Sequence, residues 1–201
     1  MPCKVRSIHQ KGRLRMIKSW YNWLTGNRES DAERRVETPS PANAVAPDDI
    51  DPTTGALRWE RFLAMFNDEQ EQAPGVLLVI DLSTHSESID MVAANNRDDI
   101  LPWLAQAIRA AIRSDDLLAH VSEYRFAALL RAAPQDLADS ISRRIMESVD
   151  NTIFMTTDGI ARLGVTIGGS RFGERHGEEV INAAMANLEL AKSSGAPSVI
   201  Q

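Results

Sequence analysis

Beyond residue 50 the chain alternates between apolar runs and segments with helical periodicity. A continuous apolar run predicts a fully buried strand at GVLLVIDL, and a further strand is predicted at RLGVTIGG. The shorter runs LLAHV and FAALL predict a β-hairpin. Apolar residues at helical spacing predict helices over 56–70, 135–149 and 178–193, with a broken helical stretch over 89–112 and a short last strand, PSVI. This order predicts an α/β (α+β) domain in two layers, with a mixed central sheet flanked by helices.

The turn of the predicted hairpin has an unusual composition. It lies in HVSEYRF and carries Ser122, Glu123, Tyr124 and Arg125. Two-residue hairpin turns favour Gly, Asn or Asp, because these residues reach positive φ at low cost. None of them is present, so turn geometry alone does not explain these residues.

Composition and charge narrow the setting of the protein. The chain has 201 residues, 43% of them hydrophobic, which is enough for one core. A single cysteine, Cys3, excludes a disulfide framework and a cysteine metal site within one chain. No apolar run approaches the ~20 residues that span a bilayer. These features predict a cytoplasmic protein.

The charge is divided unevenly between the first 28 residues and the rest of the chain. Residues 1–28 hold seven Lys/Arg and no acid, whereas the other 173 residues hold 15 basic and 28 acidic residues. We predict a basic amphipathic arm (1–28), a flexible linker containing Pro and Ala (29–50) and one domain (51–201). Met16 is an alternative start.

The arm carries an apolar stripe at helical spacing. The residues of this stripe are Leu14, Ile17, Trp20, Tyr21 and Leu24. With basic flanks, such a helix is suited to the inner face of an anionic membrane or to a protein partner; the alternative is that it packs on its own domain. The mostly acidic body argues against nucleic acid as a partner.

Four short motifs occur in an order that is typical of one family. DPTTGALRWERF, LLVIDL, VTIGGS and LELAKSSG resemble, in order and spacing, segments of the GGDEF domain of diguanylate cyclases, over about residues 51–200. The resemblance implies that fold. It also aligns the family's Gly-Gly-Asp-Glu-Phe signature with Ser122, Glu123, Tyr124, Arg125 and Phe126.

This alignment implies a loss of the family's catalytic chemistry. In the family, the glycines let the backbone approach GTP, and the acids serve the metal ions. Tyr124 and Arg125 instead offer a phenol and a cation, whereas Mg²⁺ prefers anionic oxygens. Asp81 matches the first metal ligand, but a single carboxylate at a strand end is as readily a turn or cap residue. We therefore expect no catalytic residue, no metal and no cofactor.

Other GTP contacts of the family are only partly present. Asp98 matches a guanine contact and Lys192 a phosphate-binding lysine. Asp98 and Asp99 are better explained as caps of a helix that begins at Ile100, with Pro102 in its first turn. Residual GTP binding is not favoured.

The family's product-inhibition site, by contrast, is matched at three positions. The segment RSDD supplies Arg113 and Asp116 of an R-x-x-D motif at the family's distance from the signature, and Arg144 matches an arginine on the next helix. Guanidinium groups stack on guanine or bind its O6/N7 edge, and a carboxylate accepts from guanine N–H groups. The alternative is structural, with Arg113 near the end of a helix and the acids in solvent.

Together these patterns predict a catalytically inactive GGDEF domain that acts as a cyclic di-GMP receptor and signals to a protein partner. One alternative is a nucleotide-independent interaction module that pairs with an active cyclase or phosphodiesterase. Formation of a homodimer or a heterodimer is a separate expectation. A third hypothesis is a cyclase with altered active-site chemistry.

Overall fold

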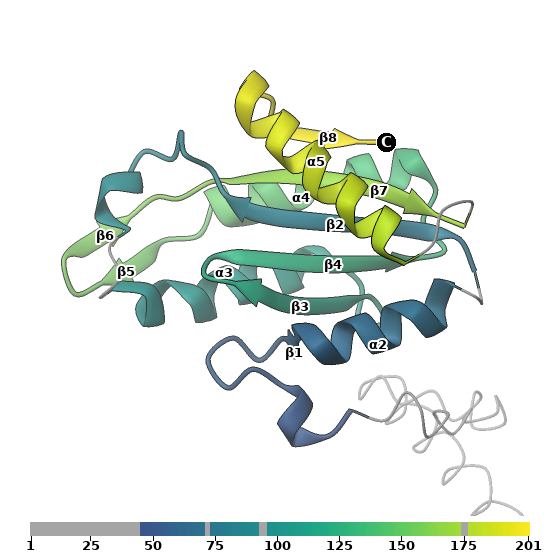
Figure 1. The fold of residues 1–201 in the computed structure, drawn as a ribbon. Helices are drawn as coiled ribbons and strands as arrows, with labels where there is room; N and C mark the ends of the chain where they lie inside the picture. The colour runs from purple at the N-terminus through teal and green to yellow at the C-terminus, as the bar shows by residue number, and fades with distance from the viewer. Residues whose placement is uncertain (1–44, 71–72, 93–95, 174–176) are drawn as a thin grey trace, which may run out of the picture. The chain divides into compact units, whose positions relative to one another are not determined.

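The computed structural model describes residues 45–70, 73–92, 96–173 and 177–201 (Figure 1). The predicted arm, with its apolar stripe, and most of the predicted linker lie outside the described residues. The first described element is a short 3-10 helix, η2 (Pro47–Asp49), and Ile50 then forms an isolated bridge with Leu57.

One mixed sheet of six strands forms the centre of the domain. In spatial order the strands are β1 (Leu57–Arg58), β3 (Leu117–Ser122), β4 (Arg125–Arg131), β2 (Gly75–Leu82), β7 (Val165–Phe172) and β8 (Ser198–Ile200). β2 is antiparallel to both β4 and β7, whereas the outer pairs β1–β3 and β7–β8 are parallel. The predicted mixed sheet and its β3–β4 hairpin are confirmed.

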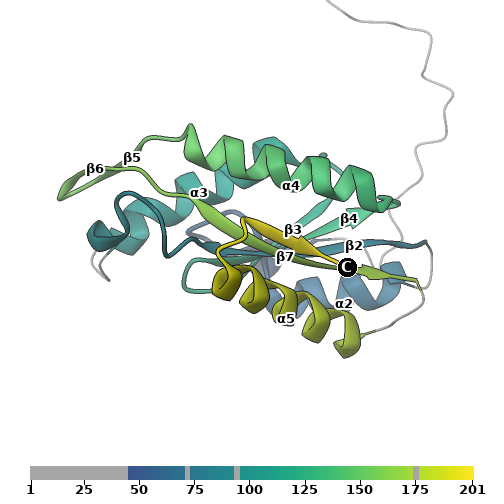
Figure 2. The same ribbon diagram turned by 90° about the horizontal axis from the view of Figure 1, so that it is seen from above.

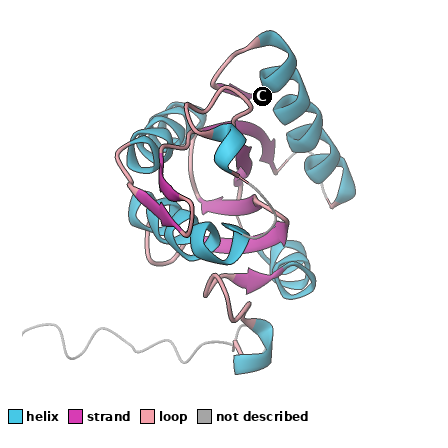
Figure 3. Cartoon of the chain, turned by 90° about the vertical axis from the view of Figure 1, so that its left-hand side faces the viewer, coloured by secondary structure: helices cyan, strands magenta, loops and turns pink. Residues whose placement is uncertain are grey.

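Helices cover both faces of this sheet (Figures 2 and 3). α3 (Arg97–Ala111) and α4 (Gln135–Asp150) pack on one face, and α2 (Trp59–Gln70) and α5 (Glu178–Ser194) pack on the other. The predicted mixed sheet flanked by helices is therefore confirmed. The domain has three layers, helices–sheet–helices, where two layers were expected.

β2 is apolar along its length because both of its faces are buried. Val76, Leu78 and Ile80 pack into the core beneath α3 and α4, whereas Leu77 and Val79 pack into the core beneath α2 and α5. A strand covered on both faces needs a nearly continuous apolar run. The predicted helix over 56–70 also has a strand at its start, because Leu57 and Arg58 pair with β3.

The start of α3 corrects the predicted caps. A 3-10 turn, η3 (Ile89–Met91), precedes it, and the N-cap of α3 is Asn96. Asp98 and Asp99 therefore lie inside the first turn, and Pro102 lies in the second turn, where it cannot donate to the carbonyl of Asp98. Asn96 is fully buried because it bonds to residues 61 and 62 positions away, a distance at which local pattern carries no signal.

A second hairpin, absent from the sequence prediction, precedes β7. It consists of β5 (Phe154–Thr156) and β6 (Gly159–Ala161), which form their own two-stranded sheet. Each strand is only three residues long, too short to show alternation. Phe154 and Ala161 are nevertheless fully buried in the core shared with α3 and α4.

The helices of the described ranges include none that is both long and apolar enough to cross a bilayer.

α5 approaches β7 closely at one glycine. A Cβ atom on Gly168 would overlap the backbone of Ala184 and Leu188. One residue away, the Asn187 side-chain amide donates to the carbonyl of Gly169 at 2.8 Å. The helix therefore rests directly on the strand, and a side chain at residue 168 would force the two apart.

We expect Gly168→Ala to lower the free energy of unfolding by about 3 kcal/mol, because overlap with backbone cannot be relieved by side-chain rotation. Urea unfolding measures the change. Gly164→Ala is the matched control, since its added Cβ would meet no atom nearer than 3.8 Å. An equal loss in both variants would contradict the close approach of α5.

Candidate functional site

An ion cluster surrounds Asp81 at the end of β2. Its Oδ2 accepts from Arg125 Nε at 3.0 Å and Nη2 at 2.7 Å, and from Lys192 Nζ at 2.9 Å. Its Oδ1 accepts from the Leu82 backbone N–H at 2.9 Å. Glu189, which is largely exposed, lies 4.0 Å from Arg125 and 3.9 Å from Lys192. The two cations are thus balanced by two acids.

Three elements bring this cluster together. β2 carries Asp81, β4 begins with Arg125 on the neighbouring strand, and the last turn of α5 carries Lys192. The Asp81 side chain is only 15% exposed, so its partners compensate a carboxylate that is largely removed from water. Asp81 and Lys192, singled out separately in the sequence, are in direct contact, and Arg125 joins them.

The β3–β4 turn places Glu123 and Tyr124 between Ser122 and Arg125, which are paired. Glu123 has φ +38°, in the region that glycine favours. His120 stabilises this turn by donating from Nε2 to the Glu123 carbonyl at 2.9 Å. The turn therefore holds a strained backbone without a glycine.

Tyr124 turns inward from the same turn. It packs against the core on the α3 side of the sheet, and its hydroxyl is buried with no hydrogen-bond partner among the described residues. Burial raises the pKa of Tyr124, the nearby Arg97 lowers it, and the carboxylates of Glu123 and Asp98 raise it; the net shift is upward. The phenol is thus buried on the face of the sheet that α3 and α4 cover.

Asp116 is a buried organiser of the α3–β3 connection. Its side chain accepts two backbone N–H groups, from Arg113 to Oδ2 at 2.9 Å and from Arg131 to Oδ1 at 3.2 Å. The residue is 3% exposed. The alternative in which the acids of this segment are solvated is therefore wrong for Asp116.

Two further arginines, which the sequence did not single out, brace this connection. Arg109 donates from Nη1 to the Asp116 carbonyl at 2.9 Å; burial lowers the pKa of its guanidinium, and Asp116 opposes this shift. Arg131 donates to the Asp115 carbonyl at 2.7 Å and forms an ion pair with Glu69 on α2. These partners are separated by up to 62 positions, so no local motif indicated them.

Arg113 and Arg144 converge at the end of α3. The Arg113 side chain is exposed beside the buried Asp116. Arg144 on α4 is also exposed, and its Nε donates to the carbonyl of Ala111 at 2.7 Å, two residues before Arg113. The structure thus brings the three predicted ligand residues to one connection, with two exposed guanidinium groups and one buried carboxylate.

No group of three or more potential metal ligands occurs in the part of the chain that the structure describes. The histidines there make local contacts: His85 with Thr84, and His120 with the two turns that it links. At Asp81, the outer carboxylate oxygen faces the side chains of Arg125 and Lys192.

Comparison with known proteins identifies the family. A family model described as "Diguanylate cyclase, GGDEF domain" matches residues 50–198. The chain belongs to the GGDEF family. A comparison with curated protein sequences finds no match.

Solved GGDEF structures share the fold. The FimX GGDEF domain from Pseudomonas aeruginosa is 23% identical, with a TM-score of 0.69, over 78% of this chain and all (100%) of that one. The diguanylate cyclase SiaD from the same organism, in complex with its activator SiaC, is 19% identical with a TM-score of 0.69, over 96% and 73%. The GGDEF domain of DgcB from Caulobacter crescentus, in complex with c-di-GMP, is 16% identical with a TM-score of 0.67, over 81% and 98%. At such low identity the likeness shows the fold alone.

Asp51 ties the opening turn of the GGDEF domain to the hairpin. Its Oδ1 accepts from the backbone N–H and the hydroxyl of Thr54, both at 2.8 Å, and its Oδ2 lies 3.6 Å from His120 Nδ1. Burial raises the pKa of Asp51, but the Thr54 hydrogen bonds and the attraction of His120 outweigh it, so the pKa is lowered. The ionised carboxylate therefore stabilises the folded state.

Asp51→Asn should destabilise the domain by about 1 kcal/mol at neutral pH. Because the folded-state pKa is lowered, this contribution is complete above the ordinary value near 3.8 and is lost as the pH falls through the lower folded value. Thermal melts from pH 7 to pH 2.5 should show the difference between wild type and variant closing at the acidic end. Asp48→Asn, at an exposed position, should have no such effect, and a gap that stays constant with pH would contradict this role of Asp51.

Proposed function

We propose that this GGDEF domain does not synthesise cyclic di-GMP but binds it as a receptor and signals to a protein partner. The observation that carries the proposal is the convergence of Arg113 and Arg144 on the end of α3. In the same proposal the protein is cytoplasmic, requires no cofactor, and uses residues 1–28 to attach to anionic lipid or to a partner.

The ion cluster at Asp81 supports the absence of catalysis. Mg²⁺ needs anionic oxygens with open lone pairs, and Asp81 already faces Arg125 and Lys192. Bringing a metal ion to this carboxylate would require the displacement of two cations at close range, with repulsion between like charges. Two-metal phosphoryl transfer would have to begin from that unfavourable state.

The hairpin turn supports the same conclusion. If residues 122–126 are the signature, Tyr124 and Arg125 stand where the family has its acidic pair. Tyr124 packs against the core with its hydroxyl buried, so it offers no anionic oxygen to a metal ion. The turn is held in place by the hydrogen bond from His120 to the Glu123 carbonyl.

With GTP and Mg²⁺ or Mn²⁺, the purified protein should form no cyclic di-GMP above a blank without enzyme. The reason is that Tyr124 and Arg125 replace the metal-binding acids of the signature, and that Asp81 is already paired with Arg125 and Lys192. Chromatographic detection of product after long incubation tests this. Multiple-turnover product formation that disappears in Asp81→Asn would sink the claim of inactivity.

The exposed guanidinium groups support ligand binding at the end of α3. Arg144 reaches Ala111 through Nε, and the structure records no partner in the described ranges for its terminal nitrogens or for the guanidinium of Arg113. Planar guanidinium groups stack on guanine and bind its O6/N7 edge or phosphate oxygens. The DgcB GGDEF domain, of the same fold, has been solved with c-di-GMP.

Asp116 has a positioning role in this proposal. Its oxygens hold the backbone of Arg113 and Arg131, and its burial leaves little surface for a ligand. Together with Arg109 it keeps the connection in one conformation. A preformed loop lowers the entropic cost of binding, because fewer groups are ordered by the ligand.

Cyclic di-GMP should bind with low-micromolar or tighter affinity, about −8 kcal/mol, and GMP and GTP should bind much more weakly. Arg113→Ala and Arg144→Ala should each cost about 1–3 kcal/mol, through loss of charge-assisted contacts. Isothermal titration calorimetry measures both. Arg143→Ala, the exposed neighbour on α4, is the matched control and should bind as wild type does.

Asp116→Asn separates the two roles of the motif. If Asp116 positions the loop, this variant should lose thermal stability as well as affinity, because one backbone N–H would face an amide nitrogen. Wild-type affinity in Arg113→Ala would place the ligand elsewhere. No binding by folded protein at high ligand concentration would defeat the receptor proposal.

A second candidate function, a nucleotide-independent interaction module, is favoured by one observation. The β5–β6 hairpin exposes large apolar side chains that no described segment covers: Ile153, Met155 and Ile160. SiaD, a structural neighbour, has been solved with a protein activator. In this function the domain would bind a cyclase or phosphodiesterase with Arg113 and Arg144 left without a nucleotide ligand.

A further inference from the structure

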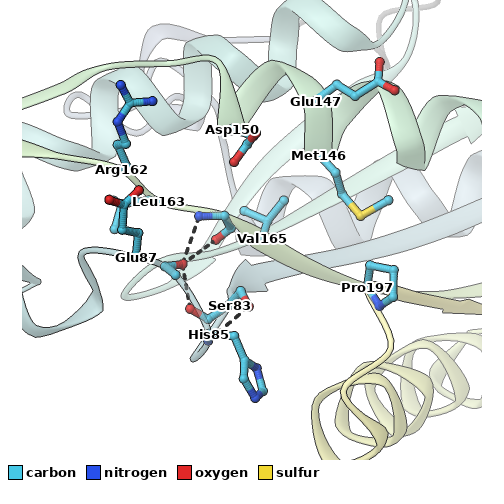
Figure 4. A pocket seen from close by; sticks show the side chains of 12 residues that line it. Ser83, His85, Glu87, Met146, Glu147, Asp150, Arg162, Leu163, Val165 and Pro197 are labelled. Carbon is cyan, nitrogen blue, oxygen red and sulfur yellow. Dashed lines mark hydrogen bonds between the residues drawn. The ribbon is translucent and has the colours of Figure 1, made fainter.

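A cavity of about 490 Å³ lies beside α4, between it, the loop after β2 and the start of β7 (Figure 4). Its apolar lining consists of Met146, Leu163, Val165 and Pro197. Its charged and ionisable lining consists of Glu87, Glu147, Asp150, Arg162 and His85. Figure 4 shows Arg162 and Glu87 at one end, Met146 and Pro197 at the other, and Asp150 and Val165 between them.

The cavity has an excess of negative charge. Glu147 and Asp150 are exposed and three residues apart, so they share one face of α4. None of the three lining carboxylates forms an ion pair within the described ranges of the chain. Arg162 is the only Lys or Arg in the lining. A ligand with positive charge is therefore complementary to it.

The neutral polar groups of the lining are already paired with one another. The Ser86 hydroxyl donates to the Ser83 carbonyl at 2.7 Å and accepts from the Gly164 N–H at 2.9 Å. Ser83 in turn accepts from the His85 N–H at 3.2 Å. The groups that remain to recognise a ligand of positive charge are the carboxylates of the lining and its apolar side chains.

Exposed apolar side chains stand on the chain segments that lead from the cavity lining into the β5–β6 hairpin. Ile153 follows Asp150 by three residues, and Ile160 precedes Arg162 by two. Ile153, Met155 and Ile160 are 56%, 70% and 61% exposed, and the last two are cross-strand partners. Exposed apolar side chains gathered in this way mark surfaces that other molecules cover.

Three hydrogen bonds tie the tip of the hairpin to the start of α3. Asn96 donates to Asp158 Oδ2 at 2.8 Å and accepts from the Thr157 hydroxyl at 2.9 Å. Asp99 Oδ2 accepts from the Thr157 backbone N–H at 3.2 Å. Because the tip is anchored, its outer face is available to a partner without prior ordering.

We infer that the cavity and the hairpin face form a docking site for a protein segment in which apolar residues alternate with Lys or Arg. The basic side chains pair with Glu147 and Asp150, and the apolar ones cover Met155 and Ile160. A small cation would leave the hairpin exposed, and the carboxylates repel nucleic acid and anionic lipid. The site does not depend on cyclic di-GMP, because none of its residues belongs to the end of α3.

Selection from a random peptide library displayed on phage, with the full chain as bait, tests this inference. We expect enriched peptides to combine Lys or Arg with apolar residues. Synthesised peptides should bind Glu147→Lys/Asp150→Lys at least about tenfold more weakly, with a similar loss in Met155→Ser/Ile160→Ser. Positions 147 and 150 lie in the last turns of α4, where the helix dipole favours positive charge, so the charge-reversed protein should fold.

Asp139→Lys, an exposed charge reversal near the other end of α4, is the control and should bind the peptides normally. Exchange of Lys for Glu in a peptide should restore its binding to the charge-reversed protein, an effect that a purely structural role of Glu147 and Asp150 would not produce. No enrichment, enrichment of acidic peptides, or undiminished binding to the double variants would each overturn the inference.

Discussion

The burial of β2 on both faces is the constraint on which the rest of this structure depends. Its backbone pairs with β4 and β7, while Leu78 and Leu77 point into opposite cores. Two helical layers are then needed to keep water from the strand, and Gly168 lets α5 rest directly on the neighbouring strand. The same strand ends at Asp81, so the core determines where the charged cluster lies.

At Asp81 the energetic problem is a carboxylate at the edge of an apolar interior. A metal ion is one way to compensate such a charge, and internal cations are another. In this chain Arg125 and Lys192 compensate the charge of the Asp81 carboxylate. The arrangement supports the proposal that this end of the sheet has no part in phosphoryl transfer.

α4 links the other two surfaces that we propose to be functional. Arg144 contacts the end of α3, whereas Glu147 and Asp150 face the cavity roughly one to two turns further along the helix. The first surface offers guanidinium groups to an anionic, guanine-bearing ligand, and the second offers carboxylates to a basic segment. Their opposite charges keep the two classes of ligand apart.

The sequence by itself determined the elements with strong local signals. Continuous apolar runs indicated β2 and the β3–β4 hairpin, helical periodicity indicated α4 and α5, and the order of the motifs indicated the family. Only the tertiary structure decided which charges meet, because these contacts join residues far apart. Arg125 and Asp81 are 44 positions apart, and Asn96 and Asp158 are 62 apart. From the sequence, Asp116 was predicted to be a ligand, with a solvated acid as the alternative. The fold buries its side chain, which accepts from two backbone N–H groups, one of them 15 residues away.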